Sequence, residues 1–517
     1  MKKKTKNKWR WLLLRRGLIG LAILITLAGV LVTEENWRGK RAWETYKRDA
    51  IVRGERFDWT AFAPTNPVPD DQNFIKAPIF SGVTAPEWDD QTLAWKPATN
   101  LVDRLNMSPE RRDPTYFPDG TAGSWELARL TNLKNWQDYY RNSVTNGVGE
   151  FPVGTHAQSP AADVLLALSK YDSAIEELRA ASRRPYAWLG EYPAGDSKQF
   201  ESLLKYLAKF KRCTQVLSLR AIAELGNNQS TQALEDVQLL LRLGDALRQE
   251  PLLITHLVNM AITSYMLLPI YEGLAQHRWN DAQLAELEHA LAPRDFLADY
   301  QFAMRGEQVF ATDSLENQRI TRKYETTVEE AGKTKEITVS LRLMPSAYFY
   351  QNELAHARLN EQFLRPLVDV TNRLVRPAAV RQAETAVKTE LKHYLPYKTY
   401  KIHAGLTFPA ISKAVAKFAY SQSSVDLARV ACALERFRLA NGNYPESLDP
   451  LAPQFIAQVP HDVINGQPLH YRRTDDGRFV LYSVGWDEKD DGGQPAFTKS
   501  GSVDRNNGDW VWRYPAE

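Results

Sequence analysis

An uncharged apolar run near the N-terminus limits what this chain can fold into. Residues 17–32 contain no charged side chain, whereas residues 1–16 hold eight lysines and arginines and no acid. A helix over the apolar run is about 24 Å long, and Leu12 to Leu14 extend it towards the thickness of a bilayer. Because positive charge favours the cytoplasmic side, the sequence predicts a membrane helix with a cytoplasmic N-terminus.

The alternative to a retained membrane helix is a signal peptide that is cleaved after export. No clean small-x-small cleavage site precedes Glu34, so we expect the segment to remain as an anchor. In either case the rest of the chain is exported. The prediction is a single-pass protein of the bacterial inner membrane, with its body in the periplasm.

Length and charge restrict the number of domains and the kind of partner. A chain of 517 residues is too long for one hydrophobic core and predicts about two to four domains. Its net charge is +3, and subtracting the eight basic residues of the N-terminus leaves −5 for the remainder. No basic cluster follows residue 56, as a nucleic-acid binder would need. We therefore expect envelope proteins as partners and no nucleic acid.

Composition and periodicity divide the chain into five predicted regions. Residues 1–33 form the basic tail and anchor, residues 34–57 a solvated stalk helix, and residues 58–125 a proline-rich loop region. Residues 126–404 repeat apolar side chains at spacings of three and four, which predicts a helical bundle or an irregular α-solenoid. Residues 405–517 form a small α+β domain. The predicted fold class is therefore mainly α.

A β-hairpin and two cysteines add detail to the helical body. Residues 323–328 and 336–343 are rich in β-branched side chains and flank a turn that contains glycine, so a hairpin is expected at about residues 320–343. Cys213 and Cys432 lie on two different predicted helices. We expect both to be buried free thiols.

The standard signatures of nucleotide-binding and hydrolytic sites are missing from the sequence. There is no GxxxxGK[ST], GxGxxG, GxSxG or HExxH motif. Two Glu-x-x-His pairs fall on predicted helices, Glu286 with His289 and Glu353 with His356. A di-iron bundle would need two further inward glutamates, which the sequence does not identify. We expect these four side chains to face solvent or to pair locally.

The C-terminal region has the clearest order of elements. A helix with an apolar stripe is predicted from Pro409 to Asn441, and Gly442 follows where a left-handed capping residue belongs. Residues 468–473 and 478–484 then predict a hairpin, since a turn with Gly477 joins them. The apolar face of the helix is expected to cover this sheet.

Acidic residues crowd the loop after that hairpin. Asp487, Asp490 and Asp491 lie within five residues among glycines, and Asp509 returns later in the chain. Clustered carboxylates repel one another unless water or a cation separates them, and calcium prefers six to eight oxygen ligands at ~2.3–2.6 Å. An EF-hand is excluded, because Lys489 would occupy its third position. The residues alone leave two interpretations open, a calcium site or an ion-free surface turn.

The order of short motifs over residues ~420–512 is similar to that of the globular domain of type II secretion major pseudopilins. The motifs are Cys432–Phe437, Asn441–Pro445, Leu448–Leu451, Val459–Pro460, Asn465–Leu469, Leu481–Asp487, Gly492–Gly493 and Gly508–Trp510. The resemblance implies that the loop after the hairpin holds calcium. It further implies Asp487 and Asp509 as side-chain ligands, with Leu481 and Ser483 as additional oxygen donors. The acidic cluster adds Asp490 and Asp491 to the predicted set.

The N-terminus departs from the same family. A prepilin needs a glycine before the cleaved bond, a residue such as phenylalanine after it, and a glutamate at the fifth position of the helix. Here Leu18 follows Gly17, and the fifth position is Ala22. We therefore expect no prepilin processing and no assembly into a pseudopilus through this helix.

Two functions fit the sequence. The favoured one is a membrane-anchored extracytoplasmic scaffold or interaction protein, with a calcium-stabilised pseudopilin-like domain and a role in secretion or envelope assembly. The alternative is an envelope enzyme or ligand-binding protein with a site in a cleft of the helical body. Aromatic, basic and acidic residues that could line such a cleft are Trp136, Tyr139, Tyr140, Arg183, Arg184, Tyr186, Trp188, Asp172, Glu176 and Glu177.

Overall fold

The computed structural model describes residues 2–81, 87–89, 94–96, 104–110, 121–145, 150–188, 197–330, 333–392 and 402–515. Much of the predicted proline-rich region lies outside the described residues, as does the turn of the predicted hairpin at residues 331–332. Most of the described chain is helical, which confirms the predicted mainly α class.

The chain forms two compact units, and each is assembled from three stretches of sequence. Unit 1 consists of Met1–Ala61, Gln308–Gln362 and Ala386–Phe408. Unit 2 consists of Phe62–Glu307, Phe363–Thr385 and Pro409–Glu517. Three helices contribute residues to both units, namely α9 (Phe296–Thr321), α11 (Pro377–Lys392) and α12 (Ile402–Asn441).

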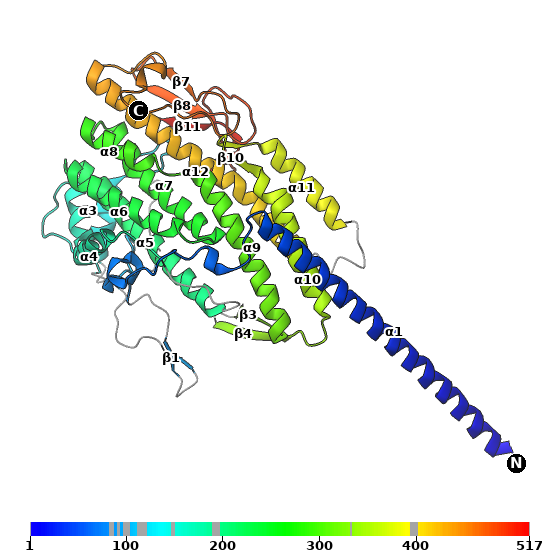
Figure 1. Cartoon of the computed structure of the whole chain (residues 1–517). Coiled ribbons are helices and arrows are strands. Elements are labelled where there is room, and N and C mark those ends of the chain that lie inside the picture. The colour runs from blue at the N-terminus through cyan, green and yellow to red at the C-terminus, as the bar shows by residue number, and fades with distance from the viewer. Residues whose placement is uncertain are drawn as a thin grey trace. The chain divides into compact units, whose positions relative to one another are not determined.

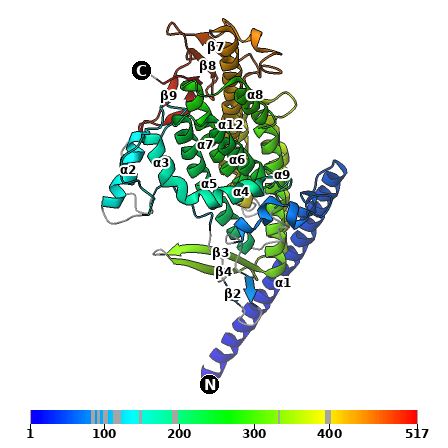
Figure 2. The ribbon, with the colours of Figure 1, turned by 90° about the vertical axis from the view of Figure 1, so that its left-hand side faces the viewer.

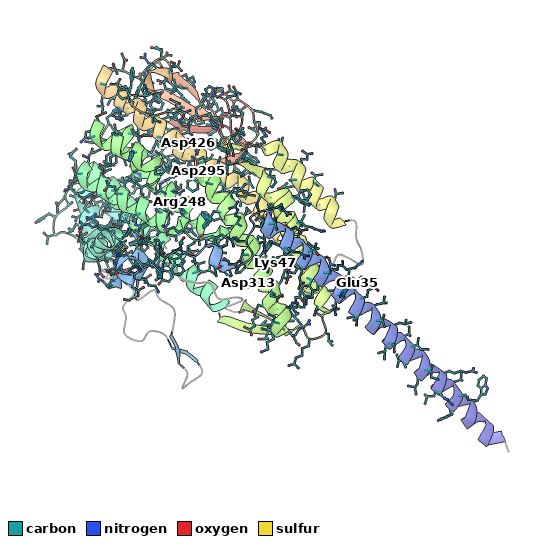
Figure 3. All side chains as sticks on the ribbon, viewed as in Figure 1. Glu35, Lys47, Arg248, Asp295, Asp313 and Asp426 are labelled. Carbon is teal, nitrogen blue, oxygen red and sulfur yellow. The ribbon has the colours of Figure 1, made fainter. Side chains whose placement is uncertain are left out.

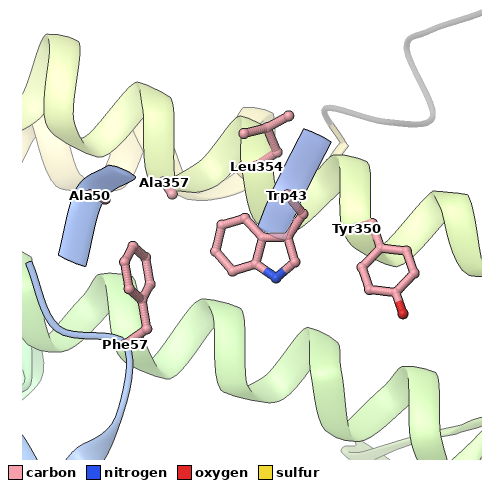
Figure 4. Packing of buried hydrophobic residues seen from close by; sticks show 6 residues of the cluster. All are labelled: Trp43, Ala50, Phe57, Tyr350, Leu354 and Ala357. Atoms are coloured by element: carbon pink, nitrogen blue, oxygen red, sulfur yellow. The ribbon is translucent and has the colours of Figure 1, made fainter. Parts of the chain in front are cut away.

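Unit 1 is built along α1, a single helix from Lys2 to Val52 that joins the predicted anchor and stalk without a break (Figure 1). Helix α10 (Ser346–Leu359) packs along the C-terminal part of α1. The contact buries a cluster of apolar side chains, which are Trp43, Ala50, Phe57, Tyr350, Leu354 and Ala357 (Figure 4). The expectation of a solvated stalk is therefore wrong, because one side of it is buried. Its buried side carries few large side chains, with Trp43 in the cluster and Tyr46 packed against it, so the sequence pattern hides it.

A pair of antiparallel strands in unit 1 lies where the sequence predicts the hairpin. Strand β3 covers Lys323–Glu330 and strand β4 covers Lys333–Ser340. The register places Tyr324 opposite Val339 and Thr326 opposite Ile337. Side chains alternate between the two faces of a strand, so Tyr324, Ile337 and Val339 share one face of the hairpin.

The helical body of unit 2 is compact, because α5, α6 and α7 each pack on the other two. Local sequence signals define its helices. Ser159 caps α3 and Pro160 follows at the first helical position, while Asn280 and Gln283 form a capping box at the start of α8. The body contains α2 (Leu133–Thr145), α3 (Pro160–Leu168), α4 (Asp172–Ser182), α5 (Ser197–Gly226), α6 (Ser230–Arg248), α7 (Leu253–Ala275) and α8 (Asp281–Leu291).

Short elements connect these helices. The 3-10 helices are η1 (Trp59–Ala61), η2 (Asp70–Gln72), η3 (Phe74–Lys76), η4 (Pro78–Phe80), η5 (Ser169–Tyr171), η7 (Arg365–Leu367) and η9 (Asp449–Leu451), and η6 (Asn360–Leu364) is a π-helix. Two small antiparallel pairs are formed by β1 (Glu87–Asp89) with β2 (Ala94–Lys96) and by β5 (Val368–Asp369) with β6 (Leu374–Val375).

The C-terminal part of unit 2 contains a three-stranded antiparallel sheet in the order β11-β8-β7. Strand β7 (His470–Arg473) and strand β8 (Phe479–Ser483) form the expected hairpin, and β11 (Trp510–Arg513) pairs with the other edge of β8. Strands β9 (Pro495–Phe497) and β10 (Val503–Gly508) form a separate pair. The small sheet is compatible with the predicted C-terminal α+β region.

Helix α12 is longer and more deeply buried than the sequence suggests. It begins at Ile402, seven residues before the predicted start at Pro409, and lies between the small sheet and helices α7 and α8 (Figures 1 and 2). On the sheet side, Trp510 packs edge-on against Tyr420 with ring centroids 5.1 Å apart. On the opposite side, the Phe296 amide donates to Gln422 at 2.8 Å. The C-terminal sheet and the helical body therefore share one core helix.

Candidate functional site

Asp509 is the centre of the predicted calcium loop. It lies between β10 and β11 with only 1% of its surface exposed. Three backbone amides donate to its carboxylate, those of Asp491, Gly493 and Gln494, at 3.1, 2.7 and 3.2 Å. Burial raises the pKa of Asp509, and the amide hydrogen bonds partly offset the increase. Asp509 thus fastens the end of the acidic loop to the strands that follow.

Asp487 and Asp491 have other roles in the same loop. The carboxylate of Asp487 accepts from the backbone amides of Gly508 at 3.2 Å and Lys489 at 3.3 Å. Asp491 contributes its backbone amide to Asp509 and is itself exposed. The Gly508 amide bond to Asp487 and the Asp491 amide bond to Asp509 tie the acidic loop to the end of β10 and to the residue before β11.

Asp490 is bound at the edge of the sheet. Its carboxylate accepts from the Gly492 amide at 2.9 Å and from the Tyr482 hydroxyl at 3.0 Å. The Gly492 amide is the main reason that the pKa of Asp490 is lowered. The His470 ring stacks on Tyr482, and its Nδ1 lies 3.5 Å from the second oxygen of Asp490. Asp490 therefore belongs to a small polar cluster with β7 and β8.

Leu481 and Ser483 are held within β8, the central strand. Leu481 is buried opposite Trp512 on one side and Tyr471 on the other, so its backbone belongs to the sheet. The Ser483 hydroxyl donates to the buried carboxylate of Asp462 at 2.9 Å.

Asp462 is a structural acid that sequence reasoning missed. Besides the Ser483 hydroxyl, it accepts from the backbone amides of Ile464 and Val484 at 2.9 and 3.0 Å. The available sequence signal was an aspartate directly after Pro460-His461, at the start of a turn.

The predicted ligands lie in one region without converging on one point. The donors to these acids are backbone amides and hydroxyl groups, which compete with a cation for carboxylate oxygens. Among the residues that the structure describes, no three His, Cys, Asp or Glu side chains form a group that could hold a metal ion. Hydrogen bonds within the chain close the loop, and calcium binding stays a prediction from the resemblance. The residues concerned are Asp487, Asp490, Asp491, Asp509, Leu481 and Ser483.

Several of the residues named for an enzyme site take part in packing or in ion pairs. Trp136 and Tyr140 are buried and stack on each other with centroids 5.7 Å apart. The carboxylates of Asp172, Glu176 and Glu177 each have an arginine within ion-pair distance. Two free carboxylates beside exposed aromatic rings, the arrangement that a glycosidase site needs, are therefore not found at these positions.

A buried polar layer crosses the helical body of unit 2. Arg248 at the end of α6 donates from Nε to both oxygens of Asp299 on α9 at 3.0 and 3.2 Å. His256 on α7 is fully buried, with Nδ1 4.0 Å from Asp299, and burial followed by the charge of Arg248 lowers its pKa to about 3. Arg373 pairs with both Asp295 and Asp426, two of the side chains labelled in Figure 3. The layer joins α6, α7, α9 and α12.

An open hollow of about 490 Å³ lies next to this layer. It is lined by residues of α9 and by residues 368–371, among them Phe302, Arg305 and Asp369. Phe302 separates the hollow from His256, since the two rings are 6.1 Å apart. The lining supplies a single carboxylate, so the hollow does not provide an acid-base pair.

Glu435 near the sheet accepts hydrogen bonds from three side chains, and sequence reasoning missed it. It accepts from His277 Nδ1 at 2.8 Å, from the Tyr444 hydroxyl at 2.6 Å, and from two nitrogens of Arg438 at 2.7 and 2.9 Å. Burial alone would raise its pKa, but the hydrogen bonds from Arg438, His277 and Tyr444 lower it to about 2. Glu435 links α12 to the turn that follows α7.

Other sequence expectations divide into confirmed and wrong. Cys213 and Cys432 are buried free thiols, as predicted. Glu286 and His289 are exposed, also as predicted. Glu353 and His356 are instead buried in unit 1, and burial raises the pKa of Glu353 to about 8. These two side chains therefore do not face solvent, the first of the two expected outcomes, because α10 packs against α1.

No family model, curated protein or solved structure matches this chain.

Proposed function

We propose that this protein is a membrane-anchored scaffold whose folded body lies on the extracytoplasmic side of the bacterial inner membrane. The observation that carries the proposal is the continuity of α1. One helix contains the basic tail, the apolar run and the buried residues Trp43 and Ala50. A retained helix of this kind connects the bilayer directly to the core of unit 1.

Tryptophans at both ends of the apolar run support the membrane position of α1. Trp11 and Trp37 are each 62% exposed, and Trp9 is 71% exposed. Trp11 and Trp37 are separated by about 39 Å along the helix, close to the ~40–45 Å of a bilayer with its head groups. Tryptophan prefers the two interfaces of a membrane. The eight basic residues at the N-terminus favour a cytoplasmic location for that end.

The scaffold role is supported by the way in which unit 2 is held together. Helix α12 is packed on two sides, and ion pairs such as Arg429 with Glu288 at 2.8 Å connect it to α8. The resemblance of residues ~420–512 to a major pseudopilin domain favours other envelope proteins as partners. Phe497 of β9 is 52% exposed and provides an apolar position for such a contact.

Calcium binding stays a prediction that comes from the resemblance. An ion could use Asp509 only by replacing or sharing the three amide hydrogen bonds that this carboxylate accepts. The scaffold proposal does not depend on calcium, because hydrogen bonds already close the loop.

Topology and extraction test the anchor. The full chain should stay with membranes at alkaline pH, and protease added outside spheroplasts should reach the body but leave the N-terminal tail. Leu24→Arg places a charge in the apolar run at a cost of about 2.5–3.5 kcal/mol and should release the protein. A wild-type chain that is extracted at alkaline pH would contradict the proposal.

The scaffold role has its own test in cells. A photoreactive side chain at Phe497 should crosslink an envelope protein, whereas the same group at the exposed Asn507 of β10 should give much less product. Equal products at the two positions would show that Phe497 marks no specific contact.

A further inference from the structure

Unit 1 exposes an apolar surface at the base of its hairpin. Tyr324, Ile337 and Val339 share one face of the hairpin and are 44%, 38% and 45% exposed. Leu343 and Met344 follow in the loop before α10, at 99% and 42%. Together these five residues are called the hairpin surface. Exposed apolar side chains gathered in one short part of the chain mark a candidate interaction site.

The hairpin surface is fixed to α10 by Arg322. Its guanidinium donates to the Met344 carbonyl and to the Ser346 hydroxyl, each at 2.7 Å. The Leu341 amide in turn donates to the Arg322 carbonyl at 2.8 Å. The base of the hairpin and the loop before α10 therefore keep one arrangement.

The start of α10 is in turn fixed to α1 close to the end of the apolar run. The Ala347 amide donates to Asn36 Oδ1 at 2.7 Å, and Gly39 lies against Ala347. Further along, Tyr46 of α1 and Arg53, the residue directly after α1, donate to Glu361, which follows α10. The two helices therefore run in the same direction, and the loop that precedes Ala347 lies on the membrane side of this contact.

The distance along α1 places that loop at the membrane surface. Asn36 is four residues beyond Val32, the last residue of the apolar run, which is about 6 Å along the helix axis. The head-group layer on each side of a bilayer is about 5–8 Å thick. Leu343 precedes Ala347 by four residues and lies within this layer when α1 spans the membrane.

We propose that the hairpin surface contacts the lipid bilayer that holds α1, as a second and peripheral membrane attachment. The inference rests on the proposed anchor. Residues 320–345 contain five basic and four acidic side chains, so apolar contact rather than attraction to anionic lipid drives the attachment. A lipid-held hairpin restricts how unit 1 can tilt about α1.

Accessibility of single labels in lipid nanodiscs tests this proposal with the full chain. Val339→Cys and Leu343→Cys carry a spin label on the hairpin surface, and Thr338→Cys provides a matched control on the opposite face of β4. Cys213 and Cys432 are buried and stay unlabelled in the folded protein. We expect at least a threefold higher ratio of oxygen to nickel-chelate accessibility at positions 339 and 343 than at position 338.

A label at Leu24→Cys separates failure of this proposal from failure of the anchor. A lipid signal at position 24 with full water exposure at 339 and 343 would overturn the hairpin contact and leave the anchor intact. A water signal at position 24 would overturn the anchor itself. Protection at 339 and 343 only in discs that hold two copies would identify a second copy as the occupant and also overturn the proposal.

Discussion

Helices α1 and α7 are both long and apolar enough to cross a membrane, yet they have opposite surroundings. In the described part of the chain these are the two such helices, and the most apolar stretch is 0% buried in α1 but 56% buried in α7. Helix α7 carries His256, Asn259 and Glu272 in its buried face. The apolar run of α1 carries no such groups. Hydropathy therefore shows that both helices need an apolar environment. The buried polar residues of α7 indicate that the surrounding protein provides this environment there.

The largest expected loss of stability comes from truncating a side chain on the buried side of α1, compared with one on its exposed side. Trp43→Ala removes a side chain that is 6% exposed in unit 1 and should cost about 3–5 kcal/mol of stability, as truncation of a buried tryptophan does. Trp37→Ala on the same helix is the matched control, since Trp37 is 62% exposed. Thermal unfolding in detergent should show a large decrease for the first variant only. Equal decreases would mean that α10 does not cover α1.

Substitution of one glycine in each helix tests whether α7 is tightly packed and the apolar run of α1 is not. A Cβ on Gly273 of α7 would lie 2.0 Å from Trp279 Nε1, and Trp279 is buried. Gly273→Val should therefore destabilise unit 2 by about 3 kcal/mol. Gly20→Val in α1 meets no atom within 4 Å and should leave unfolding unchanged. A stable Gly273→Val variant would show that α7 is less tightly packed than described.

The buried acids Glu272 of α7 and Glu435 of α12 should make stability depend on pH in opposite directions. Burial raises the pKa of Glu272 from 4.5 to about 7, with hydrogen bonds from Thr131 as a smaller opposing effect. Its contribution is present below about pH 4.5 and is lost as the pH rises through 7. The pKa of Glu435 is lowered to about 2, so its contribution is present above about pH 4.5 and is lost as the pH falls through 2.

Glutamine variants measure these two contributions. Glu435→Gln should lower stability by about 2 kcal/mol at pH 7, where charged hydrogen bonds are lost, with a smaller effect at pH 3. Glu272→Gln should raise the melting temperature relative to wild type at pH 8 and leave it unchanged at pH 4. Parallel pH profiles for the two variants would contradict the opposite shifts.

The smallest expected effect is that of calcium on the melting temperature. It depends on whether backbone amides or a cation bind the buried carboxylate of Asp509. Since backbone amides already bond to Asp509, the calcium that the resemblance predicts should raise the melting temperature of the full chain only slightly above its value with magnesium or with chelator. An increase with calcium alone, absent in Asp509→Asn, would support the ligand set that the pseudopilin resemblance implies.

Much of the fold follows from sequence pattern. The apolar run, the spacing of apolar residues in α6 and α7, the cap at Asn280 and the two hairpins all depend on neighbours within a few residues. Such signals are local, so one sequence is sufficient to detect them. The acids of the C-terminal loop were found in the same way, by their spacing.

Long-range partners could not be predicted in this way. Gly39 and Ala50 do not read as an apolar stripe until α10 is placed beside them. Glu435 resembles a surface residue until His277, 158 positions away, donates to it. The function of the acids at 487–509 likewise depends on which atoms face them, and carboxylate spacing does not distinguish an amide from a cation.

Intact mass of the membrane-extracted wild-type chain tests the central claim most directly. The account predicts one species that still contains residues 1–33, because α1 continues from the bilayer into the core of unit 1. A mature chain that begins after Val32 would contradict it.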